Sequence, residues 1–303
     1  MIELSPEIEE AIGSGQEVVA LETTLICHGL PRPDNLAAAF EIEQAVRDEG
    51  AVPATIGILD GRIKVGLSRD DIERLAGDAD VMKCSTRDLA LVLARRRPGA
   101  TTVAATIYIA HRAGIRFMAT GGLGGVHRGG ESSMDISADI GELARSATVT
   151  VCSGAKAILD LPRTVEALES HGVALYGFKT DHLPGFYVAR TAISVPGLTS
   201  VDDVRDMITA HAAIGWPGSI VIANPPPADL AMHTREFEAL LDTALAEAAR
   251  QRIEGPAITP YLLACIAEGT KGRSVALNRA LVVANARLAA RIAMAAHTTK
   301  AKN

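Results

Sequence analysis

The chain has 303 residues, of which 48% are hydrophobic and 3% aromatic, and its formal net charge at pH 7 is -6. This length is sufficient for one large domain or two modest ones. The mild negative charge argues against a nucleic-acid backbone or an anionic membrane as the main partner, and the few aromatic rings argue against a platform for stacked nucleobases.

The first third of the chain alternates between polar, helix-like segments and apolar, β-branched runs. Ser5 is a typical N-cap residue, and Pro6 is favoured in a first helical turn. Two β-rich runs around an Asp-Gly dipeptide predict a hairpin, which we expect to decorate the domain. The expected elements are a helix from residue 6 to Gly13, a strand over 17–25, a helix over about 36–49, a hairpin over 51–68 and a charged helix after it.

The rest of the chain continues this alternation, and its strand cores are continuous apolar runs, which are typical of a sheet covered on both faces. We therefore predict a layered α/β fold with a largely buried mixed sheet, in which residues 1–303 form a single domain. The expected elements are a strand over 81–85, a helix over 87–96, a buried helix opened by Thr101 or Thr102, strands over 115–122 and 146–154, a helix over 163–172, strands over 173–180 and 218–225, and helices from about 234 with a proline-marked break at 254–262.

The cysteine pattern and the apolar runs bear on the cellular location of the protein. The four cysteines are scattered without a CxxC pair, which is typical of a reduced cytoplasmic protein and unlike a disulfide scaffold or a zinc site. The first fifteen residues are acidic and lack the apolar core of a signal peptide. The longest apolar-rich runs, near 100–125 and 276–296, contain charges and are not expected to cross a membrane.

Lys156 lies in VTVCSGAKAILDL, after an apolar β-like run and a Ser-Gly turn and at the start of a helix-like run. In open α/β sheets, ligands bind outside the carboxyl ends of the strands. The start of a helix lowers the pKa of a nearby cation, and a neutral lysine amine attacks carbonyl-like carbon. The local sequence leaves two interpretations open, a nucleophile and an ordinary lysine in a first helical turn.

A glycine-rich segment, ATGGLGGVHRGG at 119–130, directly follows an expected strand. Glycines let backbone N–H groups approach an anion, and the spacing here is neither a Walker loop nor a dinucleotide fingerprint. The segment therefore indicates a phosphorylated or otherwise anionic small ligand, with a loop that binds nothing as the alternative. His127 and Arg128 are expected to contact that ligand or to anchor the loop.

Asp135 and Asp139 are four residues apart, so on a helix they would share one face. Two carboxylates with Ser137 between them suit a hard divalent cation such as Mg²⁺ or Mn²⁺, with water in the remaining positions. Helix capping explains the same residues equally well, because Asp and Ser are favoured at helix N-termini.

Two charged residues at strand ends are further candidates. Glu22 ends an apolar run, where a carboxyl group with a raised pKa serves as a general acid; an exposed strand-end glutamate is the alternative. Lys83 suits a phosphate clamp, or is an ordinary surface lysine. The adjacent pair Cys27-His28 is not expected to form a thiol–imidazole site, because neighbouring side chains usually point apart.

Taken together, eight segments closely resemble the indigoidine synthase A-like family, also called the pseudouridine-5'-phosphate glycosidase family. The resemblance covers nearly the whole chain in order, and the glycine–histidine loop followed by DISAD and CSGAK is highly specific. The segments are VALETTLICHGLPRPDN, GAVPATIGILDGRIKVGLS, MKCSTRDL, GATTVAATI, ATGGLGGVHRGGESSMDISADIGELA, VCSGAKAILDL, TDHLPGFY and GRSVALNRALVVANARLAARIA.

This resemblance implies a homotrimeric, α/β/α layered enzyme that reversibly cleaves the C–C bond of pseudouridine 5'-phosphate with water, giving uracil and ribose 5-phosphate. Lys156 matches the nucleophile that forms an imine, Glu22 the proton donor, and Asp135 the ligand of Mn²⁺ or another divalent cation such as Mg²⁺. Some relatives join ribose 5-phosphate to a different acceptor instead, and this is the alternative. The residues that match substrate contacts are Lys83, Val103, His127, Ser137, Ala138, Asp139 and Asn285.

Overall fold

The computed structural model describes residues 2–253 and 258–300 of the chain. Its strands are β1 (Ile2–Leu4), β2 (Val18–Leu21), β3 (Val52–Leu59), β4 (Arg62–Val65), β5 (Met82–Cys84), β6 (Gly99–Thr101), β7 (Phe117–Ala119), β8 (Val149–Cys152), β9 (Ala174–Phe178), β10 (Gly197–Leu198) and β11 (Ile220–Ala223). Its α-helices are α1 (Pro6–Ser14), α2 (Asp34–Asp48), α3 (Arg69–Gly77), α4 (Leu89–Ala94), α5 (Val103–Arg112), α6 (Gly130–Ser133), α7 (Ala138–Leu143), α8 (Leu161–Ser170), α9 (Val201–Ile214), α10 (Thr234–Arg250), α11 (Ile258–Gly269) and α12 (Arg273–Lys300).

The strands form one sheet, in the order β1-β4-β3-β2-β7-β8-β11-β9-β10, with β6 joined to β3 and β5 joined to β6. The central strands are parallel, and β3 is antiparallel to both β4 and β6. The expected α/β fold with a mixed, largely buried sheet is therefore confirmed.

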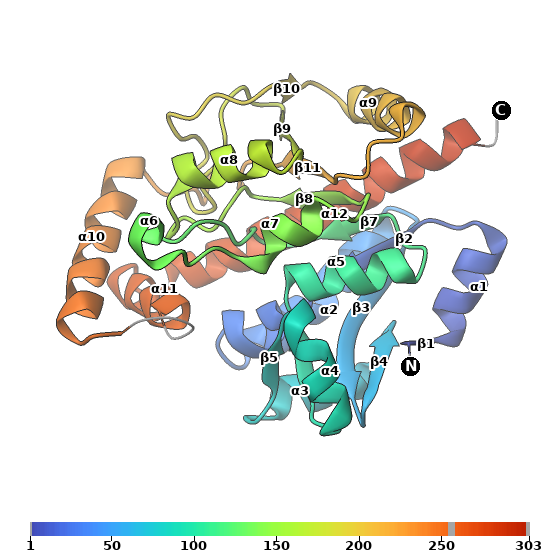
Figure 1. Cartoon of the computed structure of the whole chain (residues 1–303), viewed down its shortest axis with the longest axis horizontal. Coiled ribbons are helices and arrows are strands. Elements are labelled where there is room, and N and C mark those ends of the chain that lie inside the picture. The colour runs from blue at the N-terminus through green and yellow to red at the C-terminus, as the bar shows by residue number, and fades with distance from the viewer. Residues whose placement is uncertain (1, 254–257, 301–303) are drawn as a thin grey trace.

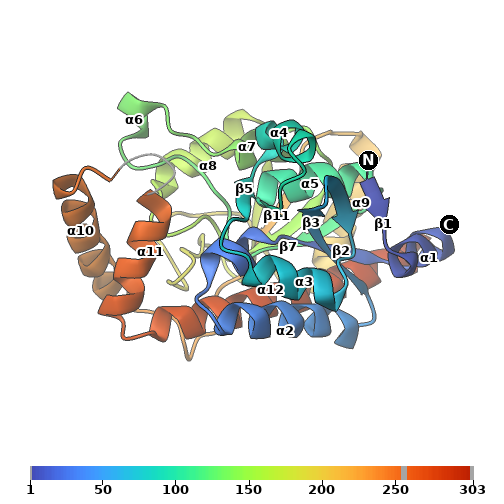
Figure 2. The ribbon, with the colours of Figure 1, turned by 90° about the horizontal axis from the view of Figure 1, so that it is seen from below.

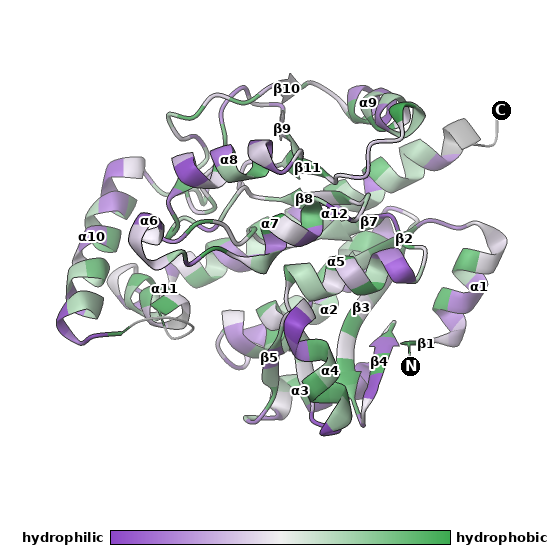
Figure 3. Ribbon diagram, in the orientation of Figure 1, coloured by the Kyte–Doolittle hydropathy of each residue, from purple (hydrophilic) through white to green (hydrophobic). Residues whose placement is uncertain are grey.

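Helices cover both faces of this sheet, which gives three layers (Figures 1 and 2). Helices α2, α9 and α12 pack on one face, and α5, α7 and α8 pack on the other. Successive residues of a strand point to opposite faces. In β2, Val19 and Leu21 accordingly join the core under α12, whereas Val18 and Ala20 join the core under α5. The central strands are hydrophobic in Figure 3, and the outer helices alternate between polar and apolar residues.

Local signals at element ends are confirmed in several places. The Ser5 side chain accepts a hydrogen bond from the Ile8 amide and caps α1, which continues slightly beyond the expected end. Thr102 caps α5 through the Ala105 amide. Asp60 and Gly61 turn the hairpin with positive φ angles. However, the first half of β3, from Val52 to Thr55, pairs with β2, so the hairpin belongs to the main sheet and does not decorate it.

Other expectations need correction. The strand expected over 17–25 ends at Leu21, and a π-helical turn, η1 (Leu25–Gly29), follows it. Strands β1, β6 and β10 are only two or three residues long, which is too short for a clear sequence pattern. Helix α9 was missed, although Ser200 caps it through the Asp203 amide and Gly215 ends it. The expected break at 254–262 lies partly outside the described residues; α10 ends at Arg250 and α11 begins at Ile258. All four cysteines are free thiols, and in the described part of the chain no helix is long and apolar enough to cross a membrane.

Candidate active site

The candidate site lies at the carboxyl ends of β2, β7 and β8. The parallel register aligns Leu21 with Ala119 and Ala119 with Val151, so the loops that follow these strands meet at one edge of the sheet. A cavity of about 270 Å³ opens between these loops, the end of β5, and helices α11 and α12. Its lining residues are Glu22, Thr24, Leu25, His28, Gly29, Lys83, Gly121, Gly122, Lys156, Phe186, Thr259, Leu263 and Asn278.

Glu22 supplies the acid of this cavity. It directly follows β2 and is 9% exposed, and the Thr120 hydroxyl donates a hydrogen bond to its carboxylate. Burial raises the pKa of Glu22, while the Lys156 ammonium and the Thr120 hydroxyl oppose that rise. The net shift favours the protonated carboxyl group, which is the form that donates a proton.

Lys156 lines the same cavity, but its position is not at a helix start. The segment after β8 forms a loop in which the Lys156 amide donates to the Leu123 carbonyl, and α8 begins only at Leu161 with Asp160 as its cap. The expectation that Lys156 begins a helix is therefore wrong, and α8 corresponds to the helix expected over 163–172. Instead, the loop holds Lys156 close enough to Glu22 for its ammonium group to oppose the rise in the pKa of that carboxyl group.

Two further basic side chains surround this pair. Lys83 is exposed at the end of β5 and lines the cavity, where desolvation and the nearby Lys156 charge lower its pKa. His127 lies in the glycine-rich loop, and desolvation together with both lysines lowers its pKa, against the effect of Asp135. The site therefore places three basic side chains around the buried carboxyl group of Glu22, an arrangement that suits an anionic ligand.

The glycine-rich loop needs its glycines for close packing. A Cβ atom on Gly122 would lie 2.6 Å from the Phe186 ring, and one on Gly124 would lie 2.2 Å from the Ser137 hydroxyl. Both contacts are shorter than any side chain tolerates. The loop therefore packs closely against Phe186 and Ser137. Within this loop, Gly121 and Gly122 line the cavity.

Asp135 and Asp139 do not share a helix face, which corrects the expected pair. Asp135 precedes α7, whereas Ser137 caps that helix and Asp139 lies in its first turn. The Asp139 carboxylate is buried and accepts hydrogen bonds from the amides of Ala104, at 2.9 Å, and Gly124, at 2.7 Å. Its role within the protein is to tie α5 to the glycine-rich loop.

The side chain of Asp135 is 44% exposed, and its carboxylate lies 4.0 Å from His127 Nδ1. Among the described residues no group of three or more His, Cys, Asp or Glu side chains is arranged to hold a metal ion. The donor set here fits only a cation that retains most of its ligands as water or substrate oxygens, as Mg²⁺ and Mn²⁺ do.

The remaining expected contacts differ in what they present. Val103 begins α5 with its side chain in the core, so it offers a ligand only its backbone. Ala138 is exposed at the start of α7. Asn285 is fully buried and does not line the cavity. Its amide donates to the Thr120 carbonyl, at 2.9 Å, and to the Ser153 hydroxyl, at 3.1 Å, so it holds the ends of β7 and β8 together.

Among the lining residues that the sequence analysis did not single out, Asn278 and His28 matter most, because each presents a polar group to the cavity. Asn278 on α12 is 4% exposed, and its Oδ1 has no partner within the described residues, although it lines the cavity. His28 also lines the cavity, while the neighbouring Cys27 points away and donates to the Leu75 carbonyl. The two side chains point apart, as expected, but the argument against a thiol–imidazole pair also left His28 out of the predicted site.

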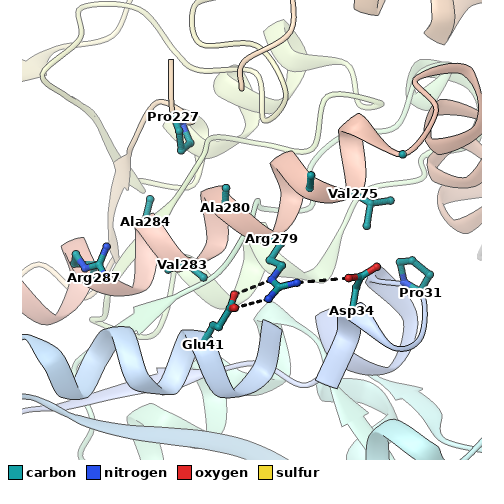
Figure 4. A pocket seen from close by; sticks show the side chains of 12 residues that line it. Pro31, Asp34, Glu41, Pro227, Val275, Arg279, Ala280, Val283, Ala284 and Arg287 are labelled. Atoms are coloured by element: carbon teal, nitrogen blue, oxygen red, sulfur yellow. Dashed lines mark hydrogen bonds and ion pairs between the residues drawn. The ribbon is translucent and has the colours of Figure 1, made fainter. Parts of the chain in front are cut away.

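A larger hollow of about 740 Å³ lies between α2 and α12, away from the cavity described above (Figure 4). Three of its charged side chains pair with each other, because Arg279 bonds to Glu41 and lies 3.5 Å from Asp34. A fourth, Arg287, lies 3.6 Å from Glu49. Small apolar residues of α12 and two prolines form much of the remaining wall. It presents no acid–nucleophile pair, so the chemistry belongs to the smaller cavity.

The fold and site define an α/β enzyme with a lysine amine and a buried carboxyl group in one cavity. Residues 7–295 match the family described as indigoidine synthase A like protein. The chain is 48% identical over 303 residues to a pseudouridine-5'-phosphate glycosidase of Paracoccus denitrificans, covering 98% of this chain and 99% of the relative. It is 47% identical to the enzyme of the same name from Herpetosiphon aurantiacus, covering 96% and 97%.

Solved structures agree. The prealnumycin C-glycosynthase AlnA in complex with ribulose 5-phosphate superposes with a TM-score of 0.93 at 38% identity, covering 100% of this chain and 99% of AlnA. An indigoidine synthase A-like protein of Thermotoga maritima gives 0.88 at 35% identity, covering 97% and 95%. The chain belongs to the indigoidine synthase A-like family, and the expectation of an enzyme is confirmed.

Proposed function

We propose that this protein cleaves the C–C glycosidic bond of pseudouridine 5'-phosphate with water, reversibly, to give uracil and ribose 5-phosphate. The names of its relatives support this reaction. The observation that carries the mechanism is the meeting of Lys156 and Glu22 in one cavity, where burial raises the pKa of the acid.

A carbon leaving group makes ordinary hydrolysis by two carboxylates difficult, and a covalent amine divides the reaction into easier steps. Lys156 Nζ, as the free amine, attacks ribose C1' as the C1'–O4' bond breaks, and O4' takes the proton of the Glu22 carboxyl group. The Glu22 carboxylate then takes a proton from the attacking nitrogen. As the C1'–C5 bond breaks, Glu22 passes this proton to C5 of uracil, and the sugar remains as a protonated imine on Lys156. Water hydrolyses the imine, which releases ribose 5-phosphate and the free amine.

The surroundings suit this substrate at both ends. Lys83, His127 and the amides at the start of α5 offer positive charge and N–H donors to the sugar phosphate. Asn278 Oδ1, which has no partner among the described residues, suits an N–H group of the uracil ring. From the family resemblance we also propose that Ser137, Ala138 and Asp139, at the start of α7, contact the substrate.

We further propose that Asp135 binds Mn²⁺, or Mg²⁺, through its exposed carboxylate, with His127 beside it. Such an ion would supply positive charge next to the substrate oxygens. From the family resemblance we also propose a homotrimer in the cytoplasm; sedimentation of the purified protein and cell fractionation test these two points.

The direct test is incubation of the protein with Mn²⁺ and pseudouridine 5'-phosphate, followed by chromatography for uracil. Release of uracil supports the glycosidase. The likeness to AlnA favours one alternative, the joining of ribose 5-phosphate to a different acceptor. Turnover with another acceptor, without any release of uracil, would establish that alternative.

A further inference from the structure

The π-helical turn η1 gives the cavity one complete wall. It begins three residues after Glu22, and the Leu30 amide closes it by donating to the Leu25 carbonyl at 3.1 Å. Four residues of this short stretch line the cavity: Thr24, Leu25, His28 and Gly29. Single π-turns are rare and often occur at functional sites, because the wider turn redirects side chains that an α-helix would send elsewhere.

The turn is fixed from outside. The buried Asn35 amide donates to the Ile26 carbonyl at 2.9 Å, which satisfies an acceptor within the turn. The Thr24 hydroxyl donates to the Ala100 carbonyl of β6 at 3.2 Å. Ala100 in turn pairs with Lys83 of β5, so the turn and the strand that carries Lys83 are tied to the same neighbour.

This arrangement sets His28 opposite Lys83. Both side chains line the cavity, and Lys83 is the charged group that acts on His28, by lowering its pKa together with desolvation. Within the described residues neither side chain has an ion-pair partner within 4.0 Å, and the His28 ring has no hydrogen-bond partner. Two basic side chains that line one cavity and repel each other when both are charged suit an anion as a shared ligand.

We propose that η1 places His28 as a specificity residue, which holds the 5'-phosphate of the substrate together with Lys83. The inference rests on the proposed function. His28 lies six residues after Glu22, near the end of η1, and lines the same cavity as Lys83. The phosphate is the end of the substrate that is distant from C1' and carries two negative charges.

The test compares pseudouridine 5'-phosphate with unphosphorylated pseudouridine in the full-length protein. A charge-assisted hydrogen bond corresponds to about a tenfold to hundredfold effect on binding. His28→Ala is therefore expected to lower kcat/KM about tenfold to a hundredfold for the phosphorylated substrate and to leave the slower cleavage of pseudouridine unchanged. His111→Ala, at an exposed histidine near the end of α5, serves as the control and is expected to change neither value.

An equal loss with both substrates, or no loss with either, would overturn the role of His28. If the unaltered protein cleaves neither substrate, the proposed reaction fails, and calorimetry with inorganic phosphate then tests His28 separately. In that experiment we expect His28→Ala to weaken phosphate binding by about tenfold or more. Unchanged phosphate affinity would reject the inference, whatever the reaction turns out to be.

Discussion

Replacing Asn285 by alanine tests whether this buried residue positions the ends of β7 and β8, which carry the loops of the site. The side chain is fully buried, donates to the Thr120 carbonyl and the Ser153 hydroxyl, and accepts from the Asn224 amide at 3.0 Å. The substitution removes the partner of two buried groups, at Thr120 and Ser153, and of the half-buried Asn224 amide. Each buried group left unsatisfied costs about 1–3 kcal/mol. Because the Ser153 hydroxyl can rotate to another acceptor, we expect a loss of about 3–5 kcal/mol in the free energy of unfolding.

Urea denaturation of the two proteins measures this difference directly. Asn278→Ala is the matched control, because this asparagine lies on the same helix and its Oδ1 has no protein partner among the described residues. The control is expected to lose less than about 1.5 kcal/mol of stability but to lose substrate affinity. A loss below about 1 kcal/mol for Asn285→Ala would refute the positioning role.

Three further changes test the acid, the backbone and the metal. Glu22→Gln keeps a partner for Thr120 but removes the proton. Burial raises the pKa of Glu22, and the wild-type rate is expected to fall as the pH rises through that pKa, because the acid loses its proton. The variant should be about 10²–10⁴-fold slower than the wild type, and its rate should not show this fall. If the pH profile of the variant matched that of the wild type, Glu22 would be excluded as the acid. Gly154→Ala puts a Cβ atom 2.1 Å from the Pro184 carbonyl oxygen at a φ of 80°, and it should lower the free energy of unfolding in urea by more than about 3 kcal/mol. The control is Gly114→Ala, at a similar φ but with open space around the new Cβ, which should lower it by only about 1–2 kcal/mol. Equal losses in the two variants would contradict the close packing at Gly154. Asp135→Asn should raise the Mn²⁺ concentration for half-maximal activity about tenfold or more, and an unchanged titration would place the metal elsewhere.

Much of the fold could be predicted from the sequence because its signals are local. The Ser5 and Thr102 caps and the Asp60-Gly61 turn each depend on chemistry within a few residues. The role of β3 was different. Its alternating pattern indicates a hairpin, but its pairing with β2 joins segments far apart in the sequence. Because of that pairing, the hairpin that we expected to decorate the domain is part of the main sheet.

The site divides in the same way. Lysine and glutamate at strand ends were recognisable, because parallel strands present their carboxyl ends at one edge. The spacing of Asp135 and Asp139 was misleading, since it implies one helix face only if the helix includes both, and α7 begins at Ala138. His28 depends on a π-turn, which has no reliable sequence pattern. Asn278 became notable only when folding left its carbonyl oxygen buried and unpartnered at the cavity.

The central claim is that Lys156 forms the covalent bond to the sugar. Incubation with ribose 5-phosphate and borohydride would reduce such an imine to a stable secondary amine, which peptide mass spectrometry locates. We predict one adduct, on the peptide that contains Lys156, and its loss in Lys156→Ala while the protein remains folded. An adduct on Lys83 instead, or no adduct in a protein that still releases uracil, would contradict the imine mechanism.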